Sequence, residues 1–280
     1  MHIHICVAFC AACFFLSCAN ETNQSVVSSV DVQEQAVVQK ATISEAARFT
    51  ALAQNHYTRG NLAEALDDYG RAIEVDPKHA DAYYRRGLLK NELGNFTSAI
   101  DDFNAAMRLD KSFAARCYNE RGYAKYMLKR YNEAIADYSI SIELYPKSAN
   151  TWFNRAEAKK KTSDIPGALA DYESCAKLES NNVFVYISMG ILHEKLRNYV
   201  LAEENFTRAI SIKPDYAQSY LARAKIRHIL DNTNGALADY STSIQLDKNE
   251  PTARIFRAKL YADMGMNDKA EDDLRLAGQL

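Results

Sequence analysis

The sequence predicts an all-α protein, built as a solenoid of seven helix pairs. Three features support this fold class. Only five prolines and ten glycines interrupt 280 residues, which leaves room for long helices. An alanine recurs every 34 residues, with one step of 35, and an aromatic residue follows six of the seven alanines four positions later. Self-similarity at such a period is typical of stacked repeats. The alanines are Ala65, Ala99, Ala134, Ala168, Ala202, Ala236 and Ala270.

Each repeat is expected to form two helices joined by a short turn. A glycine or alanine stands twelve positions before each recurring alanine, and small residues at both places let paired helices approach closely. Apolar residues between them follow helical spacing. Pro166 fits the first turn of a second helix, where its missing N–H costs nothing. The repeat domain is predicted at 45–280, with repeats at about 46–79, 80–113, 115–148, 149–182, 183–216, 217–250 and 251–280.

These repeating positions resemble the tetratricopeptide repeat (TPR) family over about five-sixths of the chain. The resemblance implies a right-handed α-solenoid whose first helices line a concave wall that binds a peptide or helix of another protein. One subclass of the family holds chaperone tails with a clamp that starts with Lys and Asn four positions apart. The corresponding positions of the first repeat hold Thr50 and Gln54, and the next two repeats lack the pair as well. This clamp is therefore absent.

Arginine and aspartate residues recur with a fixed separation inside the repeats. Five arginines each precede an aspartate by sixteen residues, which places one on each helix of a pair. In the fifth repeat both charges are lost together, with Met189 and Asn205 in the two positions. We expect structural ion pairs rather than catalytic groups, namely Arg86–Asp102, Arg121–Asp137, Arg155–Asp171, Arg223–Asp239 and Arg257–Asp273.

The expected concave wall is apolar with basic edges. A groove of this kind suits an apolar segment that carries acidic residues, although about half of the apolar members should pack against the neighbouring repeat. The expected apolar members are Tyr84, Leu88, Tyr123, Tyr126, Phe153, Phe184, Ile187, Ile191 and Leu221, with Ile229 at the margin, and the basic members are Lys160, Lys195 and Lys225, with Lys161 and Lys259.

The amino-terminal residues are expected to form an export signal at 1–17. Residues 5–16 are apolar and uncharged, but as a helix they are too short for a ~30 Å hydrocarbon core. The segment Phe15-Leu16-Ser17-Cys18 resembles the lipobox of bacterial lipoproteins, which implies cleavage before Cys18 and a lipid on its thiol. Phe15 stands where that family prefers leucine, and residues 1–4 contain no Lys or Arg. A cleaved signal without lipid is the alternative, while a metal cluster of these cysteines lacks a folded frame.

Residues 18–44 are expected to be a flexible tether that starts at lipidated Cys18. The stretch is rich in Ser, Gln and Thr, and it shows no sustained apolar face. A tether after a lipid anchor would let the folded repeats stand away from a membrane.

The composition argues against several chemical functions. A net charge of −2 and a pI near 6.3 give no general attraction to nucleic acid. The histidines after the leader are scattered, and we find no HExxH-type spacing, glycine-rich phosphate loop or nucleophile elbow. Cys175 occupies a small core position and Cys117 lies in another repeat, so both are expected to be free, inert thiols. No catalytic residue, metal or cofactor is predicted.

The sequence thus predicts a non-enzymatic scaffold that binds other proteins. Its expected place is the bacterial cell envelope, as a membrane-anchored lipoprotein, with the outer membrane favoured over the inner one. The alternative is a soluble intracellular regulatory or assembly subunit of a multiprotein complex. A homodimer through the last repeat is also considered, because Leu274, Leu276 and Leu280 would lie on its open face.

Overall fold

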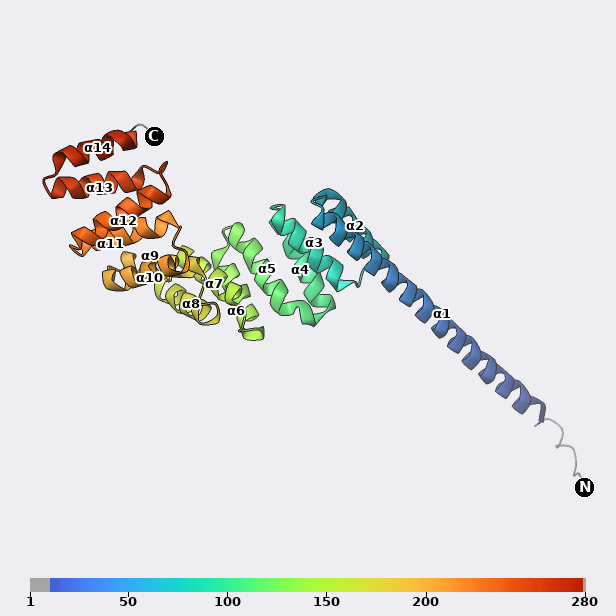
Figure 1. Ribbon diagram of the computed structural model, residues 1–280. Coiled ribbons are helices and arrows are strands. Elements are labelled where there is room, and N and C mark those ends of the chain that lie inside the picture. The colour runs from blue at the N-terminus through green and yellow to red at the C-terminus, as the bar shows by residue number, and fades with distance from the viewer. Residues whose placement is uncertain (1–10, 279–280) are drawn as a thin grey trace, which may run out of the picture. The chain divides into compact units, whose positions relative to one another are not determined.

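A computed structural model describes residues 11–278, and within this range it describes the side chains of 32–42 and 45–278. The described backbone contains fourteen α-helices, one short 3₁₀ helix and no strand. The chain divides into two compact units, of which unit 1 ends at Phe113 and unit 2 begins at Ala114. The helices of each unit pack as consecutive pairs (Figure 1), which confirms the predicted all-α solenoid class.

Unit 1 contains the first two helix pairs. Helix α1 packs on α2, and α3 packs on both α2 and α4. The first part of α1 extends beyond α2 (Figure 1). The elements are α1 (Ala11–Thr58), α2 (Leu62–Val75), α3 (Ala80–Glu92), α4 (Phe96–Leu109) and η1 (Lys111–Phe113).

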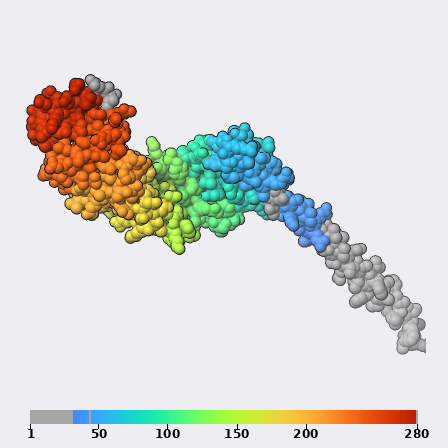
Figure 2. All heavy atoms as spheres, in the orientation of Figure 1, coloured from blue at the N-terminus to red at the C-terminus, as the bar shows by residue number. Residues whose placement is uncertain are grey.

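Unit 2 contains the other five pairs. Each helix contacts the next one along the chain, and the first helices α5 and α7, like α11 and α13, also touch each other. Figure 2 shows the atoms of this unit as one continuous body, coloured from green to red. The helices are α5 (Ala114–Met127), α6 (Tyr131–Leu144), α7 (Ala149–Lys161), α8 (Ile165–Leu178), α9 (Val183–Lys195), α10 (Tyr199–Ile212), α11 (Ala217–Ile229), α12 (Thr233–Leu246), α13 (Thr252–Asp263) and α14 (Asn267–Gly278).

The repeating small and aromatic residues form the core between the two helices of a pair. In the fifth repeat, Phe206 of α10 is fully buried against Gly190 of α9. A Cβ atom on Gly190 would lie 2.6 Å from the Phe206 ring, so the glycine is needed for this close approach. The same close approach occurs between Gly87 and Phe103 and between Gly122 and Tyr138. A Cβ atom added to these glycines would lie 2.7 and 2.8 Å from the ring.

One residue in the turn between paired helices adopts a left-handed conformation in every repeat. Three repeats place glycine there, at Gly60, Gly94 and Gly265, with φ between 74° and 81°. The four intervening repeats use residues with a Cβ atom, for which this conformation costs about 1–2 kcal/mol. They are Lys129, Ser163, Arg197 and Asp231, with φ between 57° and 65°.

The segment predicted as a flexible tether, 18–44, is helical in the structure and belongs to α1. The physical reason lies in its composition, because no proline or glycine between 19 and 44 interrupts the helical hydrogen bonds. The predicted signal at 1–17 lies partly outside the described residues, and the side chain of Cys18 is not described. Within the described residues, no helix combines the length and apolar character that a membrane crossing requires.

Candidate partner-binding surface

The structure brings all five expected Arg–Asp pairs together. In the fourth repeat, Arg155 of α7 donates two hydrogen bonds of 2.8 Å to Asp171 of α8, and Lys159 approaches the same carboxylate at 2.9 Å. The five aspartates are only 2–4% exposed. The other pairs share the two-bond geometry and are Arg86–Asp102, Arg121–Asp137, Arg223–Asp239 and Arg257–Asp273.

Arg155 also connects its repeat to the preceding one. Its third nitrogen donates to Ser139 of α6 at 3.0 Å, and the guanidinium lies 4.9 Å from the centre of the Trp152 ring. The link to the preceding second helix recurs at Arg223–Thr207 and Arg257–Ser241. Since all three guanidinium nitrogens are engaged inside the array, these arginines hold helices together.

The carboxylate partners keep the arginines charged. Donating to Asp102 raises the pKa of Arg86 above the ordinary arginine value, and Asp137 and Asp273 do the same for Arg121 and Arg257. These three arginines are therefore charged throughout the physiological pH range.

The fifth repeat replaces the ion pair by uncharged groups. Met189 is buried, and Asn205 donates to the backbone carbonyl of Leu201 at 2.7 Å. The first repeat differs in another way, because His56 lies 3.1 Å from Asp68. The second, third, fourth and sixth repeats have a cation at the equivalent position, namely Lys90, Lys125, Lys159 and Arg227.

Several of the expected groove residues pack inside their own unit instead of lining an open surface. Leu221 is only 5% exposed and belongs to the core around Tyr240, so its assignment to the groove was wrong. Phe153 makes an edge contact with Tyr172 at 5.7 Å, and Lys160 forms a 2.6 Å ion pair with Glu157. Two further aromatic residues, Tyr84 and Tyr126, contact other rings of their unit and are half-buried, as are Leu88 and Ile187.

A smaller set of wall residues stays exposed on α9, α11 and α13, and we call it the α9–α13 patch. Phe184 is 55% exposed, although its ring edge meets Tyr216, and Ile191 is 49% exposed. Tyr123 on α5 is also exposed, at 37%, but lies outside this set. The patch consists of the exposed residues Phe184, Ile191, Lys195, Ile229, Ile255 and Lys259, together with the half-buried Lys225.

Ile255 is a member of the patch that the sequence reasoning missed. Its side chain is 47% exposed. It stands 34 residues after Leu221 and 68 after Ile187, so the repeat spacing alone could have found it.

The lysines give the patch a positive character. Lys225 lies 4.2 Å from the centre of the Phe256 ring, while Lys195 and Lys259 are exposed and form no ion pair within the described residues. The acidic residues of α9, α11 and α13 are Glu194 and Asp263, and the latter lies 3.4 Å from His228.

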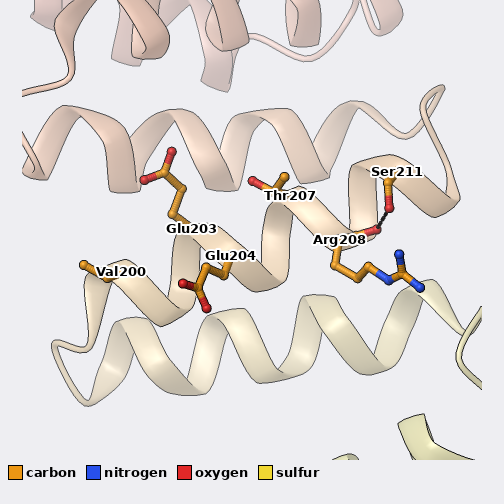
Figure 3. A pocket seen from close by; sticks show the side chains of 6 residues that line it. All are labelled: Val200, Glu203, Glu204, Thr207, Arg208 and Ser211. Atoms are coloured by element: carbon orange, nitrogen blue, oxygen red, sulfur yellow. Dashed lines mark hydrogen bonds between the residues drawn. The ribbon is translucent and has the colours of Figure 1, made fainter.

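A separate hollow lies on the outer side of α10. Val200, Glu203, Glu204, Thr207, Arg208 and Ser211 line it (Figure 3), and its volume is about 580 Å³. It is a shallow surface depression along one helix, and Glu203 is already paired with Arg227 at 2.7 Å. The hollow therefore lacks the enclosure that a small-molecule site needs.

The described residues show no arrangement typical of a metal site or of a catalytic nucleophile. They contain no cluster of histidine, cysteine and acidic side chains that could hold a metal ion. Cys117 and Cys175 are free and buried, and burial raises the pKa of their thiols to about 12 and about 11. Neither thiol is thus a reactive nucleophile at neutral pH.

The repeats are similar to those of known proteins. Family models described as tetratricopeptide repeat match residues 50–112, 92–149 and 185–216. Tetratricopeptide repeat protein 16 of Mus musculus is 29% identical over 232 residues, which are 74% of this chain and 29% of that protein. Mitochondrial import receptor subunit TOM70 of Rattus norvegicus is 26% identical over 195 residues, 66% of this chain and 32% of the receptor. The chain therefore spans about a third or less of these curated relatives.

Solved structures share the fold. The pilF protein of Pseudomonas aeruginosa superposes with a TM-score of 0.65 at 22% identity, over 78% of this chain and 99% of its own. A TPR protein of Cytophaga hutchinsonii gives 0.72 at 17% identity, covering 81% and 93%. YrrB, described as a TPR protein with an unusual peptide-binding site, gives 0.57 at 18%, covering 66% and 95%. The chain belongs to the tetratricopeptide repeat family.

Proposed function

We propose that the chain is a non-enzymatic scaffold that binds a segment of a partner protein on the α9–α13 patch. TPR proteins generally mediate protein–protein interaction. The observation that carries the proposal is the exposure of three large apolar side chains, Phe184 and Ile191 on α9 and Ile255 on α13, at 47–55%. Large apolar groups exposed together are typical of interaction surfaces. A peptide-binding site in YrrB supports the same use of this fold.

The chemistry of the patch selects an apolar partner segment with acidic residues. Covering the exposed half of each apolar side chain contributes roughly 1 kcal/mol at ~25 cal/mol per Å². Lys195 and Lys259, which have no acidic partner in the described structure, favour carboxylates at the edge of the contact. The expected complex is accordingly transient, and its association rate falls as salt rises.

Substitution at exposed positions tests this proposal without disturbing the core. We expect Phe184→Asp with Ile191→Asp to lose the partners that the parent chain captures in cross-linking affinity purification. The matched control is Leu144→Asp with Tyr145→Asp, which changes side chains of similar exposure, 54% and 55%, at the end of α6. A folded patch variant that captures the same partners as the control would refute the proposal.

The subcellular localisation of the protein is proposed from the amino-terminal sequence. We infer a lipoprotein of the bacterial cell envelope, anchored through Cys18, and the lipobox-like segment at 15–18 supports this. The alternative, a soluble intracellular subunit, is favoured by the curated relatives from mouse and rat, which are eukaryotic proteins. Labelling cells with palmitate, with Cys18→Ala as control, distinguishes the two. Absence of label on the parent chain would reject the lipid anchor.

Self-association through the last repeat is the second candidate. Leu274 of α14 is 52% exposed, whereas the aromatic residue in the same slot of other repeats, such as Tyr240, is fully buried. Leu276, two positions later on the same helix, is 42% exposed. Sedimentation of the parent chain should show a dimer that Leu274→Gln with Leu276→Gln dissociates. A parent chain that sediments as a monomer at high concentration excludes this interface.

A further inference from the structure

Unit 1 contains a small pocket that the α9–α13 patch does not involve. It lies among α1, α2 and α3, and its volume is about 100 Å³. Leu89 and Tyr69 are buried, each at 2% exposure, and together with Leu88 they provide apolar lining. The remaining lining residues are polar or charged, namely Gln54, Tyr57, Arg85 and Glu92.

Hydrogen bonds hold the polar residues in place. Tyr57 donates to Glu92 at 2.8 Å, which joins α1 to α3 on one side. On the other side, Arg85 donates to Gln54 at 2.8 Å and to Asp81 at 2.7 Å. The hydrogen bond to Glu92 raises the pKa of the Tyr57 hydroxyl, so it stays protonated and the bond persists at neutral pH. The pocket is therefore preformed, which reduces the entropy lost on binding.

The size of the pocket limits what it can accept. A dry apolar cavity of about 150 Å³ holds a benzene ring. The smaller volume here, about 100 Å³, leaves room for a branched aliphatic side chain but not for an aromatic one.

The charged residues around the pocket determine which groups of the partner segment can lie next to the bound side chain. Asp81 and Glu92 carry negative charge, and Arg85 is the cation among these groups. Arg85 uses two N–H groups in the bonds above and also interacts with the Tyr69 hydroxyl, which leaves up to two of its five donors for another acceptor. A backbone carbonyl suits these donors, whereas a carboxylate would be repelled by the two acids.

We propose that this pocket binds a single leucine-like side chain of a partner segment with no acidic residue beside it, and that Arg85 donates to the backbone of that segment. The site differs from the α9–α13 patch both in unit and in charge preference. If this pocket binds no leucine side chain, the proposed function of the α9–α13 patch in unit 2 is not affected.

Methyl NMR on the full chain tests the proposal with N-acetyl-leucine amide as the probe. We expect saturable shifts at the Leu88 and Leu89 methyl groups with a dissociation constant on the order of 10 mM, as suits one small residue. N-acetyl-alanine amide should bind at least tenfold more weakly, because it leaves the pocket unfilled. N-acetyl-leucine, which carries a free carboxylate, should also bind more weakly.

Variants of Leu88 separate filling of the pocket from loss of structure. Leu88→Trp should abolish the shifts at Leu89, whereas Leu93→Trp, at an exposed leucine beyond the end of α3, should keep them. Leu88→Ala enlarges the pocket, so N-acetyl-phenylalanine amide should then bind better than it does to the parent chain, a gain that an unfolded variant cannot give. The proposal fails if no saturable shift occurs, if alanine and leucine probes bind equally, or if Leu88→Trp titrates like the parent.

Discussion

Arg155 links α7 to both flanking second helices, and its replacement by methionine should destabilise unit 2 more than the same replacement together with Asp171→Asn. The single variant removes two 2.8 Å bonds and leaves Asp171, 2% exposed, with Lys159 as its remaining cation. Breaking a buried pair by removing one partner costs about 3–5 kcal/mol. Because Lys159 still neutralises the carboxylate, we expect about 2–3 kcal/mol for Arg155→Met.

The double variant should cost less because no buried carboxylate remains. Arg155→Met with Asp171→Asn reproduces the Met189 and Asn205 combination that the fifth repeat uses naturally. We expect a loss of about 1 kcal/mol, mainly from the missing hydrogen bonds.

Urea unfolding of the full chain, followed by far-UV circular dichroism, measures both free energies. Arg275→Met is the matched control, since its 3.0 Å pair with Asp272 is 64% and 68% exposed and should contribute less than about 0.5 kcal/mol. A double variant that is no more stable than the single variant would refute the account of the pair as a buried charge interaction. An equally large loss for Arg275→Met would show that burial is not the deciding factor.

Three further predictions follow from the backbone and the core. Arg197→Gly should raise the free energy of unfolding by about 0.5–1 kcal/mol, because φ of 60° strains any residue with a Cβ atom; a loss of stability in urea unfolding would contradict this. Gly190→Val should lower it by about 2 kcal/mol, since its Cβ would meet the buried Phe206 ring; unchanged unfolding would show that the ring can shift. Cys117 and Cys175, with pKa values raised by burial to about 12 and about 11, should resist iodoacetamide at pH 8 until the chain unfolds, as mass spectrometry can show; alkylation of the folded chain would disprove their burial.

The fold could be predicted because each repeat specifies its own helix pair. A residue such as Ala168 is fully buried against its paired helix, so its place in the period is enough to assign it. The sixteen-residue spacing between Arg155 and Asp171 is likewise a relation within one repeat. The helical backbone of 18–44 was missed because a polar composition was taken as disorder, whereas the absence of proline and glycine permits a helix.

The binding surface could be predicted only in part, since burial in a wall depends on the neighbouring repeats. Leu221 and Ile255 occupy the same position of successive repeats, yet they are 5% and 47% exposed. The apolar character of both is visible in the sequence. Their contacts are not.

By itself, the sequence determined the repeat length, the helix pairs, the family and the internal ion pairs, because these depend on residues a fixed distance apart within one repeat. Tertiary structure decided which apolar residues remain open to a partner and which are covered. It also formed the pocket of unit 1, where Gln54, Tyr57 and Arg85 come from helices whose register is set only by packing. The physical reason is that exposure and cavity volume depend on side chains from adjacent repeats, which no single repeat specifies.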